Sequence, residues 1–325
     1  MLPSVATSYM LEPLGDNENN FNTLKKVQNK MKDVIKSPPL VIGIAGASAS
    51  GKSSVLKSIS SYLNEENVTH LDLDGYHLHT REERKKLNEY PDEIKANDFD
   101  KIIHDIKALM LGKTIDMPIY DHKNGVFSSS VRLSPKQIVF VEGLHSVMIN
   151  EILGQKIVDL SVFLYPDEDL RKSWKVKRDI DERGYSYSEA TEQIANRKPF
   201  VIKYIFPQIN IADILIPIHR TENGSIKYRV LLSLTFYNRC LTDKSIKGLL
   251  LKYFRTRKVN FEDKQYAEIH LESNATIFNF LKSKTSRLGL ITSQRSIPYI
   301  EYRYSYAEMV EILFALLLTI IPRRQ

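Results

Sequence analysis

The chain has 325 residues, of which 42% are hydrophobic and 26% charged, the composition of an ordinary globular protein large enough for one large or two smaller domains. Its one cysteine, Cys240, excludes an intramolecular disulfide and favours a reducing compartment. The formal net charge of +7 leaves nucleic acid, an acidic membrane surface and phosphorylated small molecules open as partners.

The N-terminal part carries no recognisable export signal. Its first residues lack the charged start and continuous apolar core of a secretory signal, and no arginine occurs before Arg81. The most apolar stretch, residues 312–321, is too short to cross the roughly 30 Å hydrocarbon core of a bilayer as a helix. We therefore expect a cytoplasmic protein that does not bind a membrane.

Residues 17–36 are predicted to form an amphipathic helix, because apolar residues recur at helical spacing until Pro38 and Pro39 end it. Strands and helices then alternate, which predicts an α/β fold with a mainly parallel sheet flanked by helices, as in P-loop nucleotide-binding proteins. The predicted strands are 40–45, 68–73, 138–141, 158–164 and 212–218. The predicted helices are 52–63, 98–111, 167–183 and one from Ser186 that closes at Pro199.

Beyond about residue 220 the sequence contains few recognisable motifs. Strands are predicted at 227–236 and 268–271, and helices at 277–288 and 306–321. We expect three parts: an N-terminal extension at 1–37, a P-loop domain at 38–220, and an α+β C-terminal region of unassigned role at 221–325.

A complete phosphate-binding loop, GASASGKS, lies between the predicted strand at 40–45 and the helix that follows. In this pattern main-chain amides surround a polyphosphate, the lysine reaches the β and γ phosphates, and the last serine ligates Mg²⁺. The predicted nucleotide-binding residues are Gly46, Ala47, Ser48, Ala49, Ser50, Gly51, Lys52, Ser53 and Ser54. ATP and Mg²⁺ are therefore the expected cofactors.

Two acids follow predicted strands of the same sheet. Glu142 directly follows IVFV, so it is predicted to hold Mg²⁺ together with Ser53. Asp74 ends the strand after the loop helix, and it is the predicted general base for a substrate hydroxyl. The alternative for Asp74 is a turn-forming residue beside Gly75.

The segment RKSWKVKRDIDERG places Arg171, Lys175 and Arg178 within about 60° of one another on a helix. Such a basic stripe, ending in Arg183, is predicted to close over ATP and to neutralise charge on the transferred phosphoryl group. Arg178 and Arg183 therefore join Lys52 and Asp74 as predicted catalytic residues. A solvated helix face of mixed charge is the alternative.

A series of short motifs occupies about residues 40–218: GASASGKS, LDGYH, ANDFD, PIYDH, VEGLH, KRDIDERGYS, NRKP, YIFPQ and ADI. They resemble the phosphoribulokinase and uridine kinase family of P-loop kinases, and VEGLH, ANDFD and RKP before YIFPQ are closer to phosphoribulokinases. The resemblance implies ATP-dependent phosphorylation of a small hydroxylated substrate with Mg²⁺. It implies sugar-site roles for His77, Arg81, Asp100, Tyr120 and His122. It also places Lys175, Arg178, Asp179 and Arg183 on a lid, with Lys175 and Asp179 among the substrate-binding residues.

The sequence departs from that family in three places. Photosynthetic phosphoribulokinases usually carry an acid where Gly75 stands, and they carry regulatory cysteines near the loop, where this chain has Ala49 and Ser50. From about Thr221 onward no match to the usual phosphoribulokinase tail is evident.

These observations predict a kinase of a small sugar or sugar phosphate, with D-ribulose 5-phosphate as the first candidate acceptor. A uridine or nucleoside kinase is the nearest alternative, and a P-loop ATPase or nucleotide-gated regulator is an alternative of another class. The expected partner is a small molecule; nucleic acid is not expected, because acids interleave with the basic residues. A homo-oligomer remains open.

Overall fold

A computed structural model of the chain describes residues 38–63, 65–242, 247, 250 and 254–271. One sheet contains β1 (Leu40–Ala45), β2 (Val68–Asp72), β7 (Ile138–Gly143), β8 (Leu160–Pro166), β9 (Ile214–Arg220), β10 (Ile226–Tyr228), β11 (Val230–Ser233), β12 (Phe254–Phe261) and β13 (Lys264–Leu271). The α-helices are α2 (Lys52–Tyr62), α3 (Arg81–Leu87), α4 (Phe99–Met110), α5 (Ile149–Leu153), α6 (Glu168–Arg183), α7 (Tyr187–Phe200) and α8 (Leu234–Thr242). Two small sheets pair β3 (Ile115–Met117) with β6 (Val131–Leu133), and β4 (Tyr120–Asp121) with β5 (Val126–Phe127).

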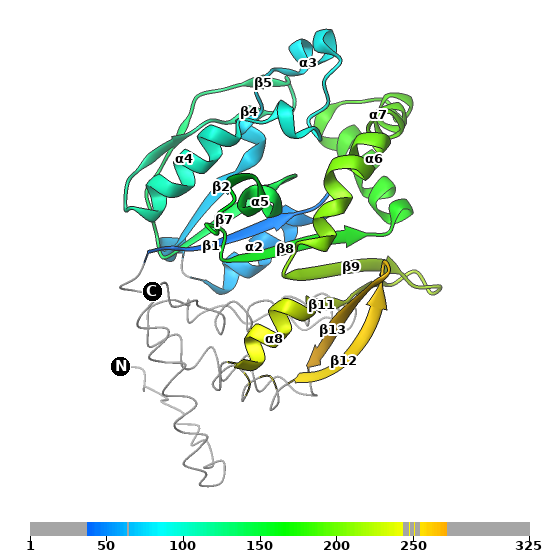
Figure 1. Cartoon of the computed structure of the whole chain (residues 1–325). Coiled ribbons are helices and arrows are strands. Elements are labelled where there is room, and N and C mark those ends of the chain that lie inside the picture. The colour runs from blue at the N-terminus through cyan, green and yellow to red at the C-terminus, as the bar shows by residue number, and fades with distance from the viewer. Residues whose placement is uncertain (1–37, 64, 243–246, 248–249, 251–253, 272–325) are drawn as a thin grey trace, which may run out of the picture.

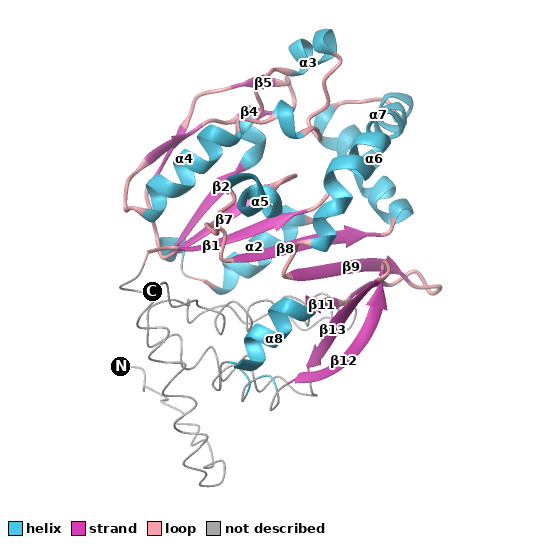
Figure 2. Ribbon diagram, in the orientation of Figure 1, coloured by secondary structure: helices cyan, strands magenta, loops and turns pink. Residues whose placement is uncertain are grey.

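The strand order is β12-β13-β11-β9-β8-β1-β7-β2, with β10 paired to the end of β9 (Figures 1 and 2). Neighbours from β2 to β9 run parallel, as predicted, and the strands beyond β9 run antiparallel. Every residue of β1 and β7 is buried, as expected for central strands covered on both faces. Their apolar runs therefore form the middle of the sheet.

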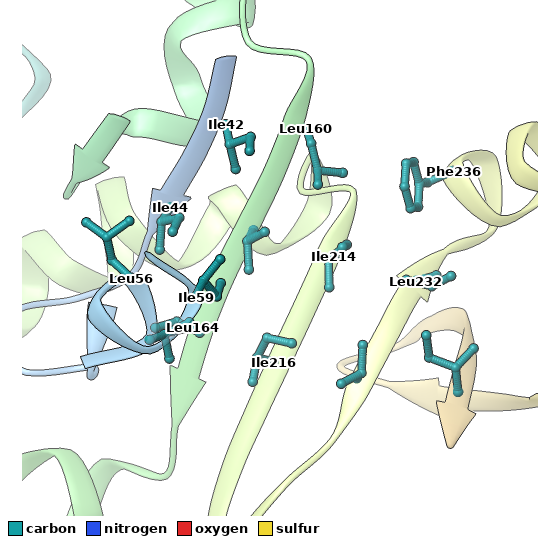
Figure 3. Close-up of a cluster of buried hydrophobic side chains, with 14 of the residues drawn as sticks. Ile42, Ile44, Leu56, Ile59, Leu160, Leu164, Ile214, Ile216, Leu232 and Phe236 are labelled. Atoms are coloured by element: carbon teal, nitrogen blue, oxygen red, sulfur yellow. The ribbon is translucent and has the colours of Figure 1, made fainter. Parts of the chain in front are cut away.

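Helices cover both faces of the sheet because successive side chains of a strand point to opposite sides. Ile42 and Ile44 face α2 and α8, in a cluster that also contains Ile59, Leu232 and Phe236 (Figure 3). Val41, on the other face, joins a second cluster with residues of α4 and α5. The sheet is thus the middle layer of three.

The strand predicted at 227–236 is wrong in its extent. The chain pairs as β10, breaks at Arg229, pairs again as β11, and then turns into α8 at Leu234. Phe236 and Cys240, four residues apart, are both buried, so this segment buries a helical face. Ser233 Oγ accepts a hydrogen bond from the main-chain N–H of Phe236 at 3.2 Å, which supports the change from strand to helix.

The prediction that Pro199 closes its helix is also wrong. Pro199 lies inside α7, and the chain continues as a π-helical turn, Val201–Ile205, and then a 3₁₀ turn, Phe206–Asn210. A proline in a helix removes one main-chain donor, and the wider turn that follows accommodates the altered hydrogen bonding. Val201, Ile205 and Ile209 are buried against the sheet, and that burial supports the irregular segment.

Other boundaries differ by a few residues, and the predicted helices 17–36, 277–288 and 306–321 lie outside the described residues. The predicted limit near residue 220 falls after β9, and the strands beyond it continue the same sheet; the three-part division stays a prediction. Among the described residues no helix is long and apolar enough to span a bilayer.

A buried acid links β12 and β13 to the residue between β10 and β11. Glu268 of β13 is 1% exposed, and its two oxygens accept hydrogen bonds from Arg229 Nε and Arg257 Nε, each at 2.7 Å. Burial alone would raise the pKa of Glu268, but these two arginines lower it below the usual glutamate range. The charged carboxylate is therefore the form that stabilises the fold.

We predict that Glu268→Gln lowers stability at pH 7, because it removes the charge that pairs with both arginines. A depressed folded-state pKa gives stability that is present above the unfolded value of about 4.3 and lost as pH falls through the folded value. The difference between wild type and variant in urea midpoint should hence shrink between pH 5 and pH 3. Glu192→Gln, at an exposed position, is the control; a pH-independent difference would contradict the prediction.

Candidate active site

The phosphate-binding loop joins β1 to α2 at the carboxyl end of the parallel strands. Gly46 has φ +149°, and a Cβ there would meet Leu164 O at 2.7 Å, so only glycine fits this turn. Lys52 Nζ donates to the main-chain oxygens of Gly46 at 3.0 Å and Ala47 at 3.3 Å. Burial lowers the pKa of Lys52, while the charges of Glu142 and Asp74 act in the opposite direction.

Ser53 and Glu142 meet at the base of the loop. Ser53 Oγ donates to Glu142 Oε1 at 2.6 Å, and His70 Nε2 lies 3.1 Å from Glu142 Oε2. Burial alone would raise the pKa of Glu142, but His70, Lys52 and Ser53 together lower it, so the acid is a carboxylate at neutral pH. A hydroxyl and a carboxylate side by side are the hard oxygen ligands that Mg²⁺ takes, so the residues present fit this ion.

Asp74 lies two residues beyond the end of β2, in the 3₁₀ turn Leu73–Tyr76, and not at the strand end as predicted. Asp72 Oδ1 accepts from the main-chain N–H of Asp74 at 2.9 Å, so Asp72 is the residue that caps this turn. His122 Nε2 lies 3.0 Å from Asp74 Oδ2, and His77 Nε2 lies 3.9 Å from Asp74 Oδ1. Two imidazoles thus flank the predicted base.

The two neighbouring aspartates have opposite pKa shifts. Burial alone would raise the pKa of Asp74, but the His122 hydrogen bond and the charges of His77, His122 and Lys52 hold it well below its usual range. Burial and the charge of Asp74 raise the pKa of Asp72 to about 6. Asp74 is therefore a carboxylate at neutral pH, the protonation state in which a general base begins, although the surrounding positive charge weakens it as a base.

One cavity of about 960 Å³ brings the loop and Asp74 together. Asp74 and the loop thus face a shared cleft. The predicted site residues that line it are Ser48, Ala49, Ser50, Gly51, Lys52, Ser53, Ser54, Asp74, His77, Arg81, Tyr120, His122, Glu142, Arg178 and Arg183. Gly46 and Ala47 do not line it, because they form the underside of the loop where Lys52 is bonded.

A buried acid organises the cations of α6. Asp179 is fully buried; it pairs with Lys175, accepts from Arg178 Nη2 at 3.0 Å, and lies 3.4 Å from Arg183 Nη1. Arg178 Nη2 also donates to Ser48 Oγ of the loop at 3.1 Å. Asp179 therefore holds Arg178 and Arg183, and Arg178 contacts the phosphate-binding loop directly.

The chain matches a known protein family. The model of the Phosphoribulokinase / Uridine kinase family matches residues 41–225, more than half of the chain. The chain belongs to this family.

Individual relatives divide between two activities. The chain is 32% identical over 227 residues to a phosphoribulokinase of Synechocystis sp., covering 70% of this chain and 63% of that protein. It is 32% identical over 200 residues to the chloroplastic phosphoribulokinase of Spinacia oleracea, covering 56% and 49%. It is 33% identical over 186 residues to a uridine kinase of Chloroflexus aurantiacus, covering 55% and 87%. The matches thus span about half to two thirds of these phosphoribulokinases' length.

A solved phosphoribulokinase from Rhodobacter spheroides shares the fold. The TM-score is 0.52 at 16% identity, with 77% of this chain and 94% of that chain covered. This likeness supports the architecture of a mainly parallel sheet with flanking helices.

Three residues that the family resemblance assigns to the site do not line the cavity. Asp100 is exposed in the first turn of α4, where Asp98 caps the helix through a 2.9 Å hydrogen bond from the Lys101 N–H. Asn97 of the same motif is buried, with its Oδ1 2.9 Å from His77 Nδ1. The sugar-site prediction for Asp100 is therefore corrected.

Lys175 and Asp179 are the other two. Lys175 is 1% exposed, and burial and the nearby charge of Arg197 lower its pKa to about 7, while Asp179 acts to raise it. The predicted basic stripe is therefore not an open face: Lys175 and Arg171 are buried, and Arg178 and Arg183 reach the cavity. Asp179 contacts Arg178 and Arg183 directly, and Lys175 contacts Asp179.

Gly75, where photosynthetic members of the family usually carry an acid, has no room for a side chain. A Cβ at this position would lie 1.9 Å from the main-chain oxygen of Pro118. Pro118 precedes β4, whose Tyr120 lines the cavity. The close approach of these two backbones thus sets the distance between the predicted base and the segment carrying Tyr120 and His122.

Sequence reasoning missed several cavity residues, among them Asp72, Arg84, Lys85, Tyr185 and Arg197. Arg197 donates from Nε and Nη2 to the two oxygens of Asp92 at 2.6 and 2.8 Å, and Asp92 is fully buried. Arg84 Nη2 donates to Tyr120 OH at 2.7 Å. The NRKP motif contained Arg197, but no local pattern indicated that its partner lay 105 residues away.

We predict that Gly75→Ala destabilises the fold by about 3 kcal/mol, at the upper end for overpacking, because two main-chain segments have to separate. Thermal or urea denaturation measures the change. Gly154→Ala is the control: a Cβ there meets nothing within 4 Å, so only its φ of +63° opposes the substitution, at about 1 kcal/mol. Equal losses in the two variants would contradict the role assigned to Pro118.

Proposed function

We propose that the chain is an ATP-dependent, Mg²⁺-requiring kinase of a small sugar phosphate, with D-ribulose 5-phosphate as the acceptor and ribulose 1,5-bisphosphate as the product. The observation that carries the proposal is the shared cavity, in which Asp74 faces Lys52, Ser53 and Glu142. Phosphoryl transfer needs phosphates and Mg²⁺ held in place, charge neutralised on the transferred group, and a carboxylate beside the attacking hydroxyl. The cavity contains a candidate for each requirement.

In the proposed reaction the acceptor hydroxyl gives its proton to Asp74 while its oxygen forms the new bond to the γ phosphorus. The bond between that phosphorus and the bridging oxygen breaks, and ADP leaves with the electron pair. Lys52, Arg178 and Arg183 bind the oxygens of the transferred group and offset their negative charge. Ser53 and Glu142 would hold Mg²⁺, which supplies further charge neutralisation when bound.

A phosphorylated acceptor is favoured by the cations of α3. Arg81, Arg84 and Lys85 line the cavity from this helix, apart from the loop that would hold ATP (Figure 1). Arg84 is committed to His79 O and Tyr120 OH, whereas Lys85 is exposed. A neutral nucleoside needs no such second group of cations. Uridine is the second candidate acceptor, because the uridine kinase relative is matched over 87% of its length.

We predict that D-ribulose 5-phosphate raises ADP release above background in a coupled assay. The same assay tests uridine, cytidine, pantothenate and glycerate as acceptors, one at a time. Asp74→Asn should lower kcat by about 10² to 10⁴, the usual contribution of a general base. The control is Asp100→Asn, the same change on the exposed side of α4, which should retain full activity.

If uridine alone raised ADP release, uridine would replace ribulose 5-phosphate as the proposed acceptor. ADP release that no acceptor raises and that survives in Asp74→Asn would point instead to a nucleotide-hydrolysing or nucleotide-gated protein.

We predict that Lys85→Gln raises the KM for ribulose 5-phosphate about 3- to 10-fold and changes kcat little, because an exposed cation contributes to binding and not to the transition state. The KM for ATP should not change. Lys86→Gln is the matched control, since Lys86 is also exposed on α3 but does not line the cavity. An equal effect in both variants would indicate general electrostatic attraction and no direct contact.

A further inference from the structure

His145 is a buried polar residue for which the proposed reaction has no use. It follows β7 at the end of the VEGLH motif and is 2% exposed. Among the described residues neither of its ring nitrogens has a hydrogen-bond partner of normal geometry. Burial lowers the pKa of His145 to about 4, although Asp92 acts in the opposite direction. The ring is therefore neutral at physiological pH, with one nitrogen able to donate and the other able to accept.

A small cavity lies between His145 and Asp74, separate from the large one. Its volume is about 10 Å³, the room for the centre of one water molecule. Its polar lining comes from Asp74, Asn97 and His145, and apolar side chains such as Phe99 and Ile102 complete the wall. Polar partners and this volume are the conditions under which proteins hold a buried water.

We propose that this cavity is the site of one structural water that joins His145 to Asp74, and that His145 is thereby a positioning residue for the base. The water donates one hydrogen to the accepting nitrogen of the imidazole and the other to a carboxylate oxygen of Asp74. Asp74 is then held on two sides: His122 and His77 flank its oxygens, and the water-bound His145 supports it from the cavity beside Phe99.

The free energy favours a cavity that holds a water molecule over an empty one. A buried imidazole whose nitrogens lack partners keeps the full cost of leaving water, which exceeds the cost of immobilising one water molecule. The only ring contact of His145 that the described residues show is an edge-on approach to Phe99, at 5.9 Å between centroids, and it satisfies no hydrogen bond. One water satisfies the accepting nitrogen of the imidazole and adds a hydrogen bond to the charged form of Asp74, while the donating nitrogen is left to the main chain of Asp92.

The first test is a crystal structure of the full chain at a resolution that shows ordered waters, for wild type and for His145→Phe. We expect wild-type density within about 3.2 Å of both a His145 nitrogen and an Asp74 oxygen, and none in the variant. An empty cavity in the wild type overturns the proposal. This readout needs no acceptor, so it is decided even if the proposed kinase activity, on which the positioning role rests, is not found.

The second test is kinetic. His145→Phe should lower kcat about tenfold, as expected for the loss of a hydrogen bond to a charged group, with the KM values for ATP and acceptor within about twofold of wild type. His145→Gln keeps a polar end and should recover part of kcat. Ile102→Val changes the wall of the same cavity without removing a polar group and should keep kcat. Wild-type kcat in His145→Phe overturns the positioning role.

Folding of each variant is checked by circular dichroism and thermal midpoint. If His145→Phe does not fold, the wild-type density and the kcat of His145→Gln decide. A kcat of His145→Gln equal to that of a folded His145→Ala variant would show that the polar end of the side chain has no part in catalysis, and it would overturn the proposal.

Discussion

The alignment of the parallel strands is the constraint on which the candidate site depends. Glu142 of β7 is in register with Ile44 of β1 on one side and with Asp72 of β2 on the other. The strands have a common direction, so their carboxyl ends reach one edge of the sheet, and the loop after β1 and the turn after β2 begin there. Apolar packing far from the chemistry, in β1 and β7, thus fixes how close Ser53, Glu142 and Asp74 can be.

Buried acids give the surrounding cations a fixed geometry. Asp179 holds the arginines of α6, and Asp92 holds Arg197 of α7 from a different segment of the chain. Removing one partner of such a buried pair is costly, because a charge is left without compensation. The cationic side of the cavity is therefore arranged before any ligand binds, and little ordering cost is left for the binding step.

The parts of the fold and site that could be predicted are those with a local signal. The loop motif predicted Lys52 and Ser53 as phosphate-loop residues, the apolar run IVFV predicted the buried strand β7, which contains Glu142 and does not end before it, and the predicted helix end at Arg183 agrees with α6. What could not be predicted depends on distant partners. Which side of ANDFD turns inward depends on His77, and the space at Gly75 depends on Pro118. The course of the chain after Pro199 depends on burial against the sheet. None of these contacts leaves a periodic pattern in the sequence.

The antiparallel strands beyond the family-matched segment have a consequence for the domain itself. Leu231 of β11 pairs with Leu215 of β9, and Phe236 of α8 belongs to the same buried apolar cluster as Ile214 and Ile216. A protein shortened at residue 225 would expose unpaired main-chain donors and acceptors along β9 and an apolar surface beside them. The parallel part of the sheet thus depends on the strands that follow it for its cover, and Tyr228 of β10 also lines the cavity, so the two parts form one structural unit.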